Sequence, residues 1–106
     1  MITAIVRFKL PADMTHAKAA ALFQGSAPKY QGMPGLIRKY YIYDSTTQTG
    51  GGCYLWQSRA DADRAYSAEW KKMVTERYGA APEMSYYETP VVVDNTTGKT
   101  IADAAE

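Results

Sequence analysis

Residues 36–57, LIRKYYIYDSTTQTGGGCYLWQ, contain the pattern that decides the fold. Residues 36–44 are rich in tyrosine and β-branched side chains, which favour strands. Residues 45–51 are polar and end in glycine, as turns do, and residues 52–57 again resemble a strand. Because the turn is short, the two strands are expected to pair as an antiparallel hairpin.

The residues before this hairpin predict a strand and a helix. Residues 2–10 alternate between two faces and end at Pro11, which is typical of a two-faced strand. Asp13 is a candidate cap for a helix whose inward side chains recur at three- and four-residue spacing. Those side chains are Ala19, Leu22, Phe23, Ser26, Ala27 and Tyr30. Glycines at 32 and 35 and Pro34 then break the chain.

The residues after the hairpin predict a helix followed by a strand. Residues 58–61, Ser-Arg-Ala-Asp, fit a capping box in its acidic form, and Gly79 ends the helix. The apolar stripe of this helix pauses at Ser67, which makes Ser67 a candidate break. The last strand runs over residues 84–93, where Pro90 marks an edge position or a bend.

This order, β-α-β-β-α-β, predicts a ferredoxin-like α+β fold. Such a chain forms a four-stranded antiparallel sheet with both helices on one face. We assign residues 1–95 to this single domain. Residues 96–106 are polar and alanine-rich without an apolar period, so we expect a flexible tail there.

The other face of the predicted sheet has no cover within the chain. It would carry Ile5 and one set of side chains from the tyrosine-rich strands. An apolar sheet face left in water is a large adhesive patch, and a partner subunit is its simplest cover. We therefore expect a homodimer, for which twofold symmetry is the commonest arrangement.

Composition excludes several classes of function. The 106 residues carry a net charge of +1, which gives no basic surface for nucleic acid or for an anionic membrane. With one cysteine, Cys53, and one histidine, His16, the chain has neither an internal disulfide nor a metal site built from several of these residues. No apolar run approaches the ~20 residues of a membrane span, and no signal peptide is visible, so we expect a cytoplasmic protein.

Three residues are candidates for catalysis: His16, Arg38 and Lys39. His16 lies on or beside the inward stripe of the first helix and can act as a general base near neutral pH, or it is an ordinary histidine at the start of a helix. Arg38 and Lys39 alternate along a strand, so one of them faces the helix-covered side or the dimer face. A charge there must be paired or must meet an anionic ligand. The alternatives are an anchor for a phenolate, enolate or carboxylate, an interface salt bridge with an acid such as Glu88, and an ordinary surface charge.

Aromatic residues are the candidates for substrate binding, since the chain has nine tyrosines and two tryptophans. Tyr54 and Trp56 share one face of a strand and, with Tyr86 or Tyr87, would form a stacking wall for a flat ligand or an ordinary packing surface. Cys53 is interpreted as a small buried hydrophobic residue. The candidate substrate-binding residues are Tyr54, Trp56, Phe23, Tyr41, Tyr87 and Trp70.

Three further stretches carry a resemblance to a known family. These are PGLIRKYY at residues 34–41, GGCYLWQSR at residues 51–59, and TPVVVDN at residues 89–95. With Glu69-Trp70 and residues 76–79 (ERYG), they resemble the YdhR-type family of proposed monooxygenases over roughly residues 1–95.

The resemblance implies a dimeric α+β barrel, in which two sheets close face to face and each subunit keeps a pocket between sheet and helices. It also implies a relationship to antibiotic-biosynthesis monooxygenases, which oxidise phenolic compounds with O₂ and no metal or flavin. In that chemistry the protein supplies a base, stabilises an anion and excludes water. We therefore expect a cofactor-independent monooxygenase for a small aromatic or quinone-like compound. A non-catalytic ligand-binding protein and an isomerase or cyclase are the alternatives, since the fold alone does not determine the reaction.

Overall fold

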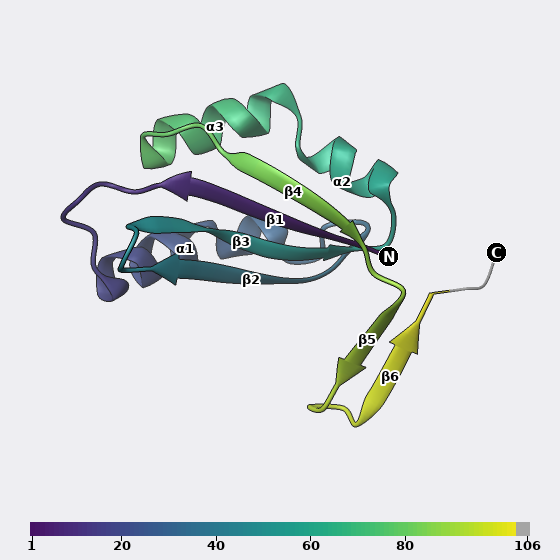
Figure 1. The fold of residues 1–106 in the computed structure, drawn as a ribbon. Coiled ribbons are helices and arrows are strands. Elements are labelled where there is room, and N and C mark those ends of the chain that lie inside the picture. The colour runs from purple at the N-terminus through teal and green to yellow at the C-terminus, as the bar shows by residue number, and fades with distance from the viewer. Residues whose placement is uncertain (104–106) are drawn as a thin grey trace.

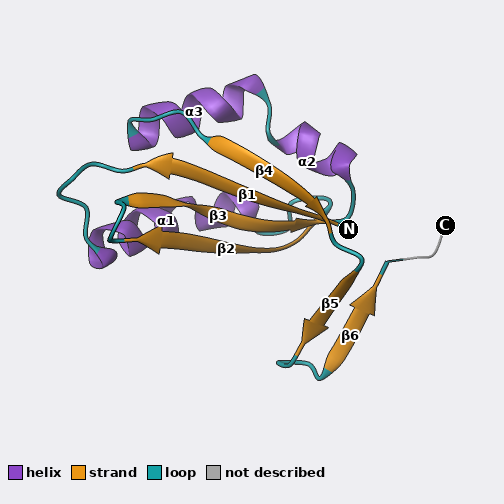
Figure 2. Cartoon of the chain, viewed as in Figure 1, coloured by secondary structure: helices purple, strands orange, loops and turns teal. Residues whose placement is uncertain are grey.

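The computed structural model describes residues 1–103 of the chain. Figure 1 shows one sheet with the helices on a single side of it, and a separate strand pair at the C-terminal end. Figure 2 distinguishes the helices from the strands in the same view. The elements in order are β1 (Ile2–Lys9), α1 (His16–Tyr30), β2 (Leu36–Asp44), β3 (Thr49–Trp56), α2 (Arg59–Ala65), α3 (Ala68–Tyr78), β4 (Glu83–Glu88), β5 (Val91–Asp94) and β6 (Lys99–Ala102).

The main sheet confirms the ferredoxin-like prediction. Its strand order is β2-β3-β1-β4, and all neighbouring strands are antiparallel. The central strand β1 places Ala4 opposite both Tyr54 and Tyr86, so these three side chains share the helix-covered face. The neighbouring residues Thr3, Leu55 and Tyr87 consequently share the opposite face.

Each helix begins at a hydroxyl side chain that satisfies a free backbone N–H. Thr15, not Asp13, caps α1, since its hydroxyl accepts a hydrogen bond from the Lys18 N–H at 3.2 Å. The prediction of an Asp13 cap was wrong. Ser58 caps α2 as predicted, by accepting from the Asp61 N–H at 3.2 Å. Ser67 caps α3 in the same way, which confirms the break in the second helix.

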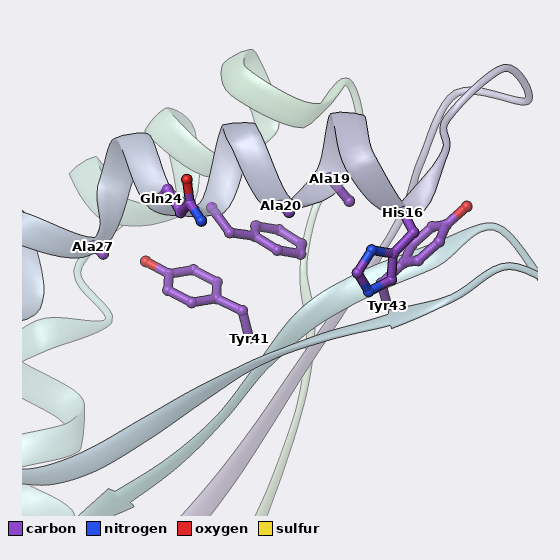
Figure 3. A pocket seen from close by; sticks show the side chains of 8 residues that line it. His16, Ala19, Ala20, Gln24, Ala27, Tyr41 and Tyr43 are labelled. Atoms are coloured by element: carbon purple, nitrogen blue, oxygen red, sulfur yellow. The ribbon is translucent and has the colours of Figure 1, made fainter.

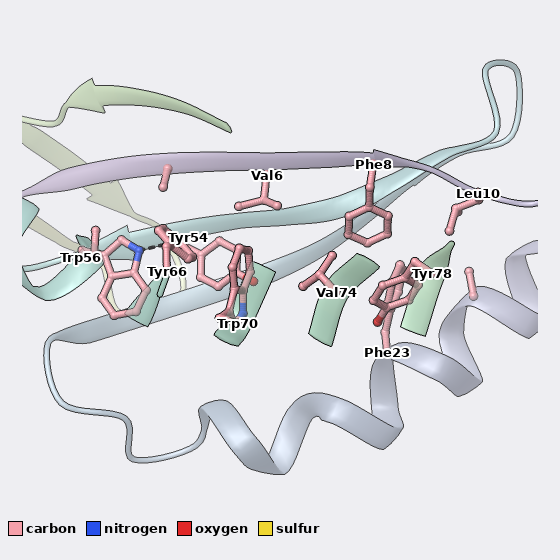
Figure 4. Close-up of a cluster of buried hydrophobic side chains, with 13 residues drawn as sticks. Val6, Phe8, Leu10, Phe23, Tyr54, Trp56, Tyr66, Trp70, Val74 and Tyr78 are labelled. Atoms are coloured by element: carbon pink, nitrogen blue, oxygen red, sulfur yellow. Dashed lines mark hydrogen bonds between the residues drawn. The ribbon is translucent and has the colours of Figure 1, made fainter. Parts of the chain in front are cut away.

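The core lies between the helices and the sheet and is largely aromatic (Figure 4). Trp56 is fully buried, and its indole N–H donates to the Tyr66 hydroxyl at 3.0 Å. Trp70 is 5% exposed and donates to the Tyr30 hydroxyl at 2.9 Å. Both indole donors are therefore satisfied inside the core, which avoids the cost of burying a free polar group.

The C-terminal segment differs from the prediction of a flexible tail. The last strand bends at Pro90 as expected, and its second half, β5, pairs with β6 to form a hairpin. Residues 99–102, expected to be loose, are therefore ordered in β6. Asp94 holds the turn, because its carboxylate accepts hydrogen bonds from the Thr96 N–H at 3.0 Å and the Thr96 hydroxyl at 2.5 Å. Residues 104–106 of the predicted tail lie outside the described residues.

This hairpin also covers part of the sheet face that was expected to lack cover within the chain. Arg38 on β2 donates to the carboxylate of Asp94 at 2.5 Å, across 56 residues of sequence. A small cavity beneath the hairpin is lined by Leu55 of the sheet and by Val92 of β5, and Leu55 is only 7% exposed. Farther along β2, Tyr40 and Ile42 remain exposed. In the described part of the chain, none of the helices is both long and apolar enough to cross a membrane.

Candidate active-site groove

The candidate site is a groove between helix α1 and the edge strand β2. Strand alternation points Arg38, Tyr40 and Ile42 away from the helices and Lys39, Tyr41 and Tyr43 toward them. Because β2 is at the edge of the sheet, no other strand of the described chain closes the space beside it. The inward side chains of β2 therefore face α1 across an open groove.

One end of the groove is a cavity of about 480 Å³ (Figure 3). Its walls are mostly apolar or aromatic, with a few polar groups, as in typical ligand sites. The lining residues are His16, Ala19, Ala20, Phe23, Gln24, Ala27, Tyr41 and Tyr43.

Tyr41 forms the floor of this cavity together with Phe23. The two rings stack with centroids 4.8 Å apart and planes inclined by 18°. The Tyr41 hydroxyl lies 2.7 Å from the Ser26 hydroxyl, which fixes the orientation of the ring. Burial raises the pKa of Tyr41, so its hydroxyl stays neutral near pH 7. The two stacked rings thus form a preformed aromatic wall of the cavity beside a hydrogen-bonding group.

His16 stands at the outer end of this cavity and is exposed (Figure 3). Its ring meets the edge of the Tyr43 ring, with centroids 6.3 Å apart. Tyr43 is anchored by a hydrogen bond from its hydroxyl to the Met14 carbonyl at 3.0 Å. His16 therefore lies at the entrance, where it can meet both solvent and a bound molecule.

The groove continues into a second cavity of about 290 Å³, which shares Ala27 and Tyr41 with the first. Tyr30 of α1 and Lys39 of β2 face this second cavity. The two cavities together run along α1 from its first residue to its last. A molecule lying on Tyr41 would therefore have His16 toward one end and Lys39 toward the other.

Lys39 is surrounded by tyrosine rings. Its Nζ atom lies 3.4 Å from the ring centre of Tyr30, 3.8 Å from that of Tyr41 and 4.5 Å from that of Tyr54. Within residues 1–103, no carboxylate forms a salt bridge with this amine. Burial, and to a lesser degree the positive charge of Lys29, lowers the pKa of Lys39 to about 7. An amine of this kind can exchange a proton near neutral pH, as a general base must.

Glycines on β3 provide the room for this arrangement. A Cβ atom at Gly52 would lie 2.8 Å from a ring carbon of Tyr54 and 3.1 Å from Cε of Lys39. A Cβ atom at Gly50 would lie 2.8 Å from Leu10 and 3.4 Å from the Phe23 ring. Since Gly52 pairs with Tyr41 and Gly50 with Tyr43, the glycines lie beside the inward side chains of β2.

The structure brings some of the predicted site residues together and separates others. His16, Phe23 and Tyr41 line the first cavity, and Lys39 and Tyr54 meet beside the second. Trp56 and Trp70 lie in the core behind Tyr54 and do not line either cavity.

Arg38 and Tyr87 lie apart from this group. Arg38 contributes to the rim of the second cavity, but its guanidinium pairs with Asp94 on the opposite side of the sheet. Tyr87 is 55% exposed on that opposite face, so it is Tyr86 that shares the face of Tyr54 and Trp56. Arg38 and Lys39 therefore do not act on the same side of the sheet.

Sequence reasoning did not single out Tyr30 or the two glycines as site residues. Tyr30 is the last residue of the inward-facing stripe predicted for the first helix, and this position could have identified it as a site residue. The sequence places Gly50 in the expected hairpin turn and Gly52 at the start of the following strand. In the described residues 1–103, no group of three His, Cys, Asp or Glu side chains is arranged to hold a metal ion.

The family of the chain is shown by its sequence. Residues 5–85 match the family described as "Putative mono-oxygenase ydhR". The chain belongs to this family. The matched residues of this YdhR-family chain include the whole groove, from His16 to Tyr54, whereas Tyr87 and Asp94 lie beyond them.

Solved structures share the fold of this YdhR-family chain at low sequence identity. SnoaB, a cofactor-independent oxygenase from Streptomyces nogalater, is 15% identical, with a TM-score of 0.59 over 83% of this chain and 91% of SnoaB. A monooxygenase from the gene ActVA-Orf6 of Streptomyces coelicolor, in complex with Nanaomycin D, is 18% identical, with a TM-score of 0.62 over 83% of this chain and 86% of that one. NE2512 from Nitrosomonas europaea, a protein of unknown function, is 14% identical, with a TM-score of 0.63 over 83% and 87% of the two chains.

At these identities the likeness establishes the fold of the YdhR-family chain and no more. No curated protein sequence matches the chain.

Proposed function

We propose that this YdhR-family chain is a monooxygenase that uses no metal or flavin and oxidises a small aromatic, phenolic or quinone-like compound. The observation that carries the proposal is the amine of Lys39, which faces a groove, has three tyrosine rings around it and has a pKa of about 7. Near neutral pH about half of such an amine is free to accept a proton.

The shape of the groove supports a flat substrate. Phe23 and Tyr41 line the first cavity with rings that stack on each other, and a planar molecule can pack against their open edges and outer faces, since offset and edge-to-face aromatic contacts are favourable. The first cavity, at about 480 Å³, falls within the range of roughly 300–1,000 Å³ that is usual for small-ligand sites. The Tyr41 hydroxyl, which Ser26 orients, provides a polar contact for a phenolic oxygen.

Lys39 would begin the reaction by removing an acidic proton from the substrate. The resulting ammonium lies in a partly buried site, where its charge stabilises the neighbouring anion more strongly than it would in water. The anion then gives electrons to O₂, a carbon–oxygen bond forms, and the Lys39 ammonium returns its proton to the peroxide oxygen. At a methylene carbon between two rings, the resulting hydroperoxide loses water to leave a carbonyl. One oxygen atom enters the product and the other leaves as water, so no outside reductant is required.

His16 remains a second candidate base. It is exposed at the entrance of the groove, so its role would be to exchange protons with solvent or to orient the outer end of the substrate. Full activity in a His16→Ala variant would remove this residue from the mechanism and leave the proposal for Lys39 intact.

Two of the structural relatives are described as oxygenases, which supports the proposal of an oxygenase. SnoaB is described as a cofactor-independent oxygenase, and the ActVA-Orf6 monooxygenase binds Nanaomycin D. We also infer a homodimer formed through the sheet face opposite the groove. Tyr40, Ile42 and Tyr87 are exposed there, and a symmetric partner would remove them from water.

Oxygen uptake with a panel of anthrones and hydroquinones, measured with a chelator and without added flavin, tests the proposal. We expect turnover with at least one compound, and a kcat/KM lower by roughly 100-fold or more in Lys39→Met, since a general base contributes about 10²–10⁴-fold. Lys72→Met is the matched control, because Lys72 is an exposed lysine on α3 outside both cavities, and it should stay within a few-fold of wild type.

The same experiment separates the alternative functions. Turnover that continues under argon would indicate an isomerase or cyclase and would overturn the oxygenase. Binding of the compounds without any turnover would indicate a ligand-binding protein.

A further inference from the structure

Lys39 differs from the other six lysines of the chain in its surroundings. Those six side chains, at positions 9, 18, 29, 71, 72 and 99, are all exposed, whereas Lys39 is partly buried. We propose that Lys39 is also a nucleophilic amine, which condenses with the carbonyl of a small planar aldehyde in the second cavity to form an imine. This activity uses the same groove as the proposed oxygenase but does not depend on oxygen chemistry.

The first argument is the absence of a counter-ion. A lysine paired with a carboxylate holds its proton and cannot attack a carbonyl carbon. None of the lysine or arginine salt bridges among the described residues includes Lys39. Its Nζ atom is flanked by ring faces instead. Placing a lysine amine in an apolar pocket, or beside another cation, is a general way to make it a nucleophile, and Lys29 supplies such a cation.

The second argument is access. Lys39 is not sealed in the core, because it lines a cavity of about 290 Å³ together with Tyr30, Gly32 and Leu36. This space is close to the lower end of typical small-ligand sites, which start at roughly 300 Å³. Tyr30 and Tyr41, whose rings lie 3.4 and 3.8 Å from the amine, can stack on a planar group carried by the carbonyl carbon. This favours an aromatic aldehyde over an aliphatic one.

The chemistry balances with residues of the chain alone. The lone pair of the Lys39 nitrogen forms a bond to the carbonyl carbon, and the carbonyl oxygen takes a proton to become a hydroxyl. The nitrogen then loses its remaining protons as the hydroxyl leaves as water, and a carbon–nitrogen double bond results. The Tyr30 hydroxyl is a candidate proton donor for the departing oxygen, because it accepts from the Trp70 indole at 2.9 Å and so keeps its own proton to donate. No oxidant or reductant is consumed.

Reductive trapping tests the proposal. Wild-type protein is mixed with benzaldehyde and cyanoborohydride near pH 7, and the benzylated lysines are identified by peptide mass mapping. An amine with a pKa of about 7 is about half free at that pH, whereas an ordinary lysine amine, at about 10.4, is free in roughly one part in 2,500. We expect Lys39 to be labelled at least tenfold faster than any other lysine, and this preference to shrink as the pH is raised toward 10.

Because the seven lysines are compared within one wild-type sample, the result does not depend on a variant that folds. Labelling without a preference for Lys39, or with Lys39 unmodified, would overturn the proposal. Lys39→Arg should lose the fast-labelled site, and Lys72→Met, which removes an exposed lysine on α3, should keep it. Oxygen uptake with the anthrone panel, measured on an untreated portion of the same preparation, separates the two proposals: fast labelling without oxygen uptake supports the imine and removes the oxygenase, and the reverse result removes the imine.

Discussion

Arg38 and Lys39 are neighbours in the chain, but their charged groups lie on opposite faces of the sheet. The Arg38 guanidinium is 2.5 Å from the Asp94 carboxylate, whereas the Lys39 amine is 3.4 Å from the ring centre of Tyr30. The first cation is paired and ties the C-terminal hairpin to the domain. The second has no carboxylate partner among residues 1–103 and faces the groove. One step along β2 therefore separates a structural charge from a reactive one.

Lys39 is expected to lower the stability of the protein in a pH-dependent way. The folded protein releases the Lys39 proton near pH 7, and the unfolded chain releases it near pH 10.4. Between these values the unfolded chain binds more protons, so the free energy of unfolding of the wild type rises with pH. Below pH 7 both states are protonated, and the penalty is constant and largest.

Lys39→Met removes this penalty. The shift in pKa sets an upper limit of about 5 kcal/mol, and contact with water reduces it. We expect Lys39→Met to be more stable than wild type by roughly 1–3 kcal/mol at pH 6, with a difference that declines between pH 7 and pH 10. Urea unfolding at several pH values measures this. A difference that does not change with pH would contradict the lowered pKa.

Asp94 is expected to keep the β5–β6 hairpin closed well into the acid range. Hydrogen bonds from the Thr96 hydroxyl, and then from Arg38, hold the pKa of Asp94 well below its ordinary value. The stabilisation it gives is therefore complete above about pH 4 and is lost only as the pH falls through the lower folded value. Asp94→Asn should speed hydrogen exchange of the residue 91–102 amides by roughly tenfold near pH 7. Asp63→Asn, which breaks an exposed pair with Arg59, is the control and should leave these amides unchanged.

The Tyr66 hydroxyl is expected to contribute to stability through Trp56. Trp56 is fully buried and its indole N–H donates only to this hydroxyl among the described hydrogen bonds, so Tyr66→Phe leaves a buried donor without a partner. The expected loss is about 1–3 kcal/mol in the free energy of unfolding. Tyr87→Phe removes an exposed hydroxyl and should change stability by less than about 0.5 kcal/mol. Equal losses in the two variants would show that the indole finds another partner.

The order of elements was predictable because each was marked by local signals. Ser58 and Gly79 mark the ends of the second helical segment, and the paused stripe at Ser67 marked the break within it. The C-terminal hairpin was missed because residues 96–106 lack an apolar period. A usable signal was present nonetheless. Residues 44–47 (DSTT) and 94–97 (DNTT) share the pattern Asp-x-Thr-Thr, and in both turns the Asp carboxylate accepts from the N–H two residues later.

The candidate site was predictable only in part. Alternation requires that Arg38 and Lys39 face opposite ways, but it does not determine which of them faces the helices. That depends on an irregularity in pairing between Leu36 and Arg38 and on Asp94, a partner 56 residues away. The environment of Lys39 also requires Tyr30 from another element and the missing side chain of Gly52. Such long-range contacts carry no local pattern.

Gly52→Ala tests whether the space beside Lys39 is required. The added Cβ would lie 2.8 Å from the Tyr54 ring and 3.1 Å from Cε of Lys39, closer than such atoms normally approach. Displacing either side chain should cost about 1–3 kcal/mol.

Gly25→Ala is the matched control, because its Cβ would meet only the end of the flexible Arg77 side chain, at 3.2 Å. In a helix this change should be neutral or stabilising by up to about 1 kcal/mol. Thermal unfolding of the two variants should therefore move in opposite directions, and a Tm for Gly52→Ala equal to that of wild type would contradict the tight packing.

The proposed dimer makes Ile42 a sensitive position. Ile42 lies on the sheet face opposite the groove, 37% exposed in the single chain, and so does Tyr40, 55% exposed. If a partner covers this face, a lysine at position 42 places a charge in an apolar interface, at a cost of several kcal/mol per buried ion. We expect Ile42→Lys to convert a dimer into a monomer in light scattering coupled to size-exclusion chromatography.

Lys71→Glu, an exposed change on α3 on the helix-covered side, is the control and should leave the dimer intact. A wild-type protein that is a monomer at all concentrations would refute the dimer. A dimer that tolerates Ile42→Lys would place its interface on another surface.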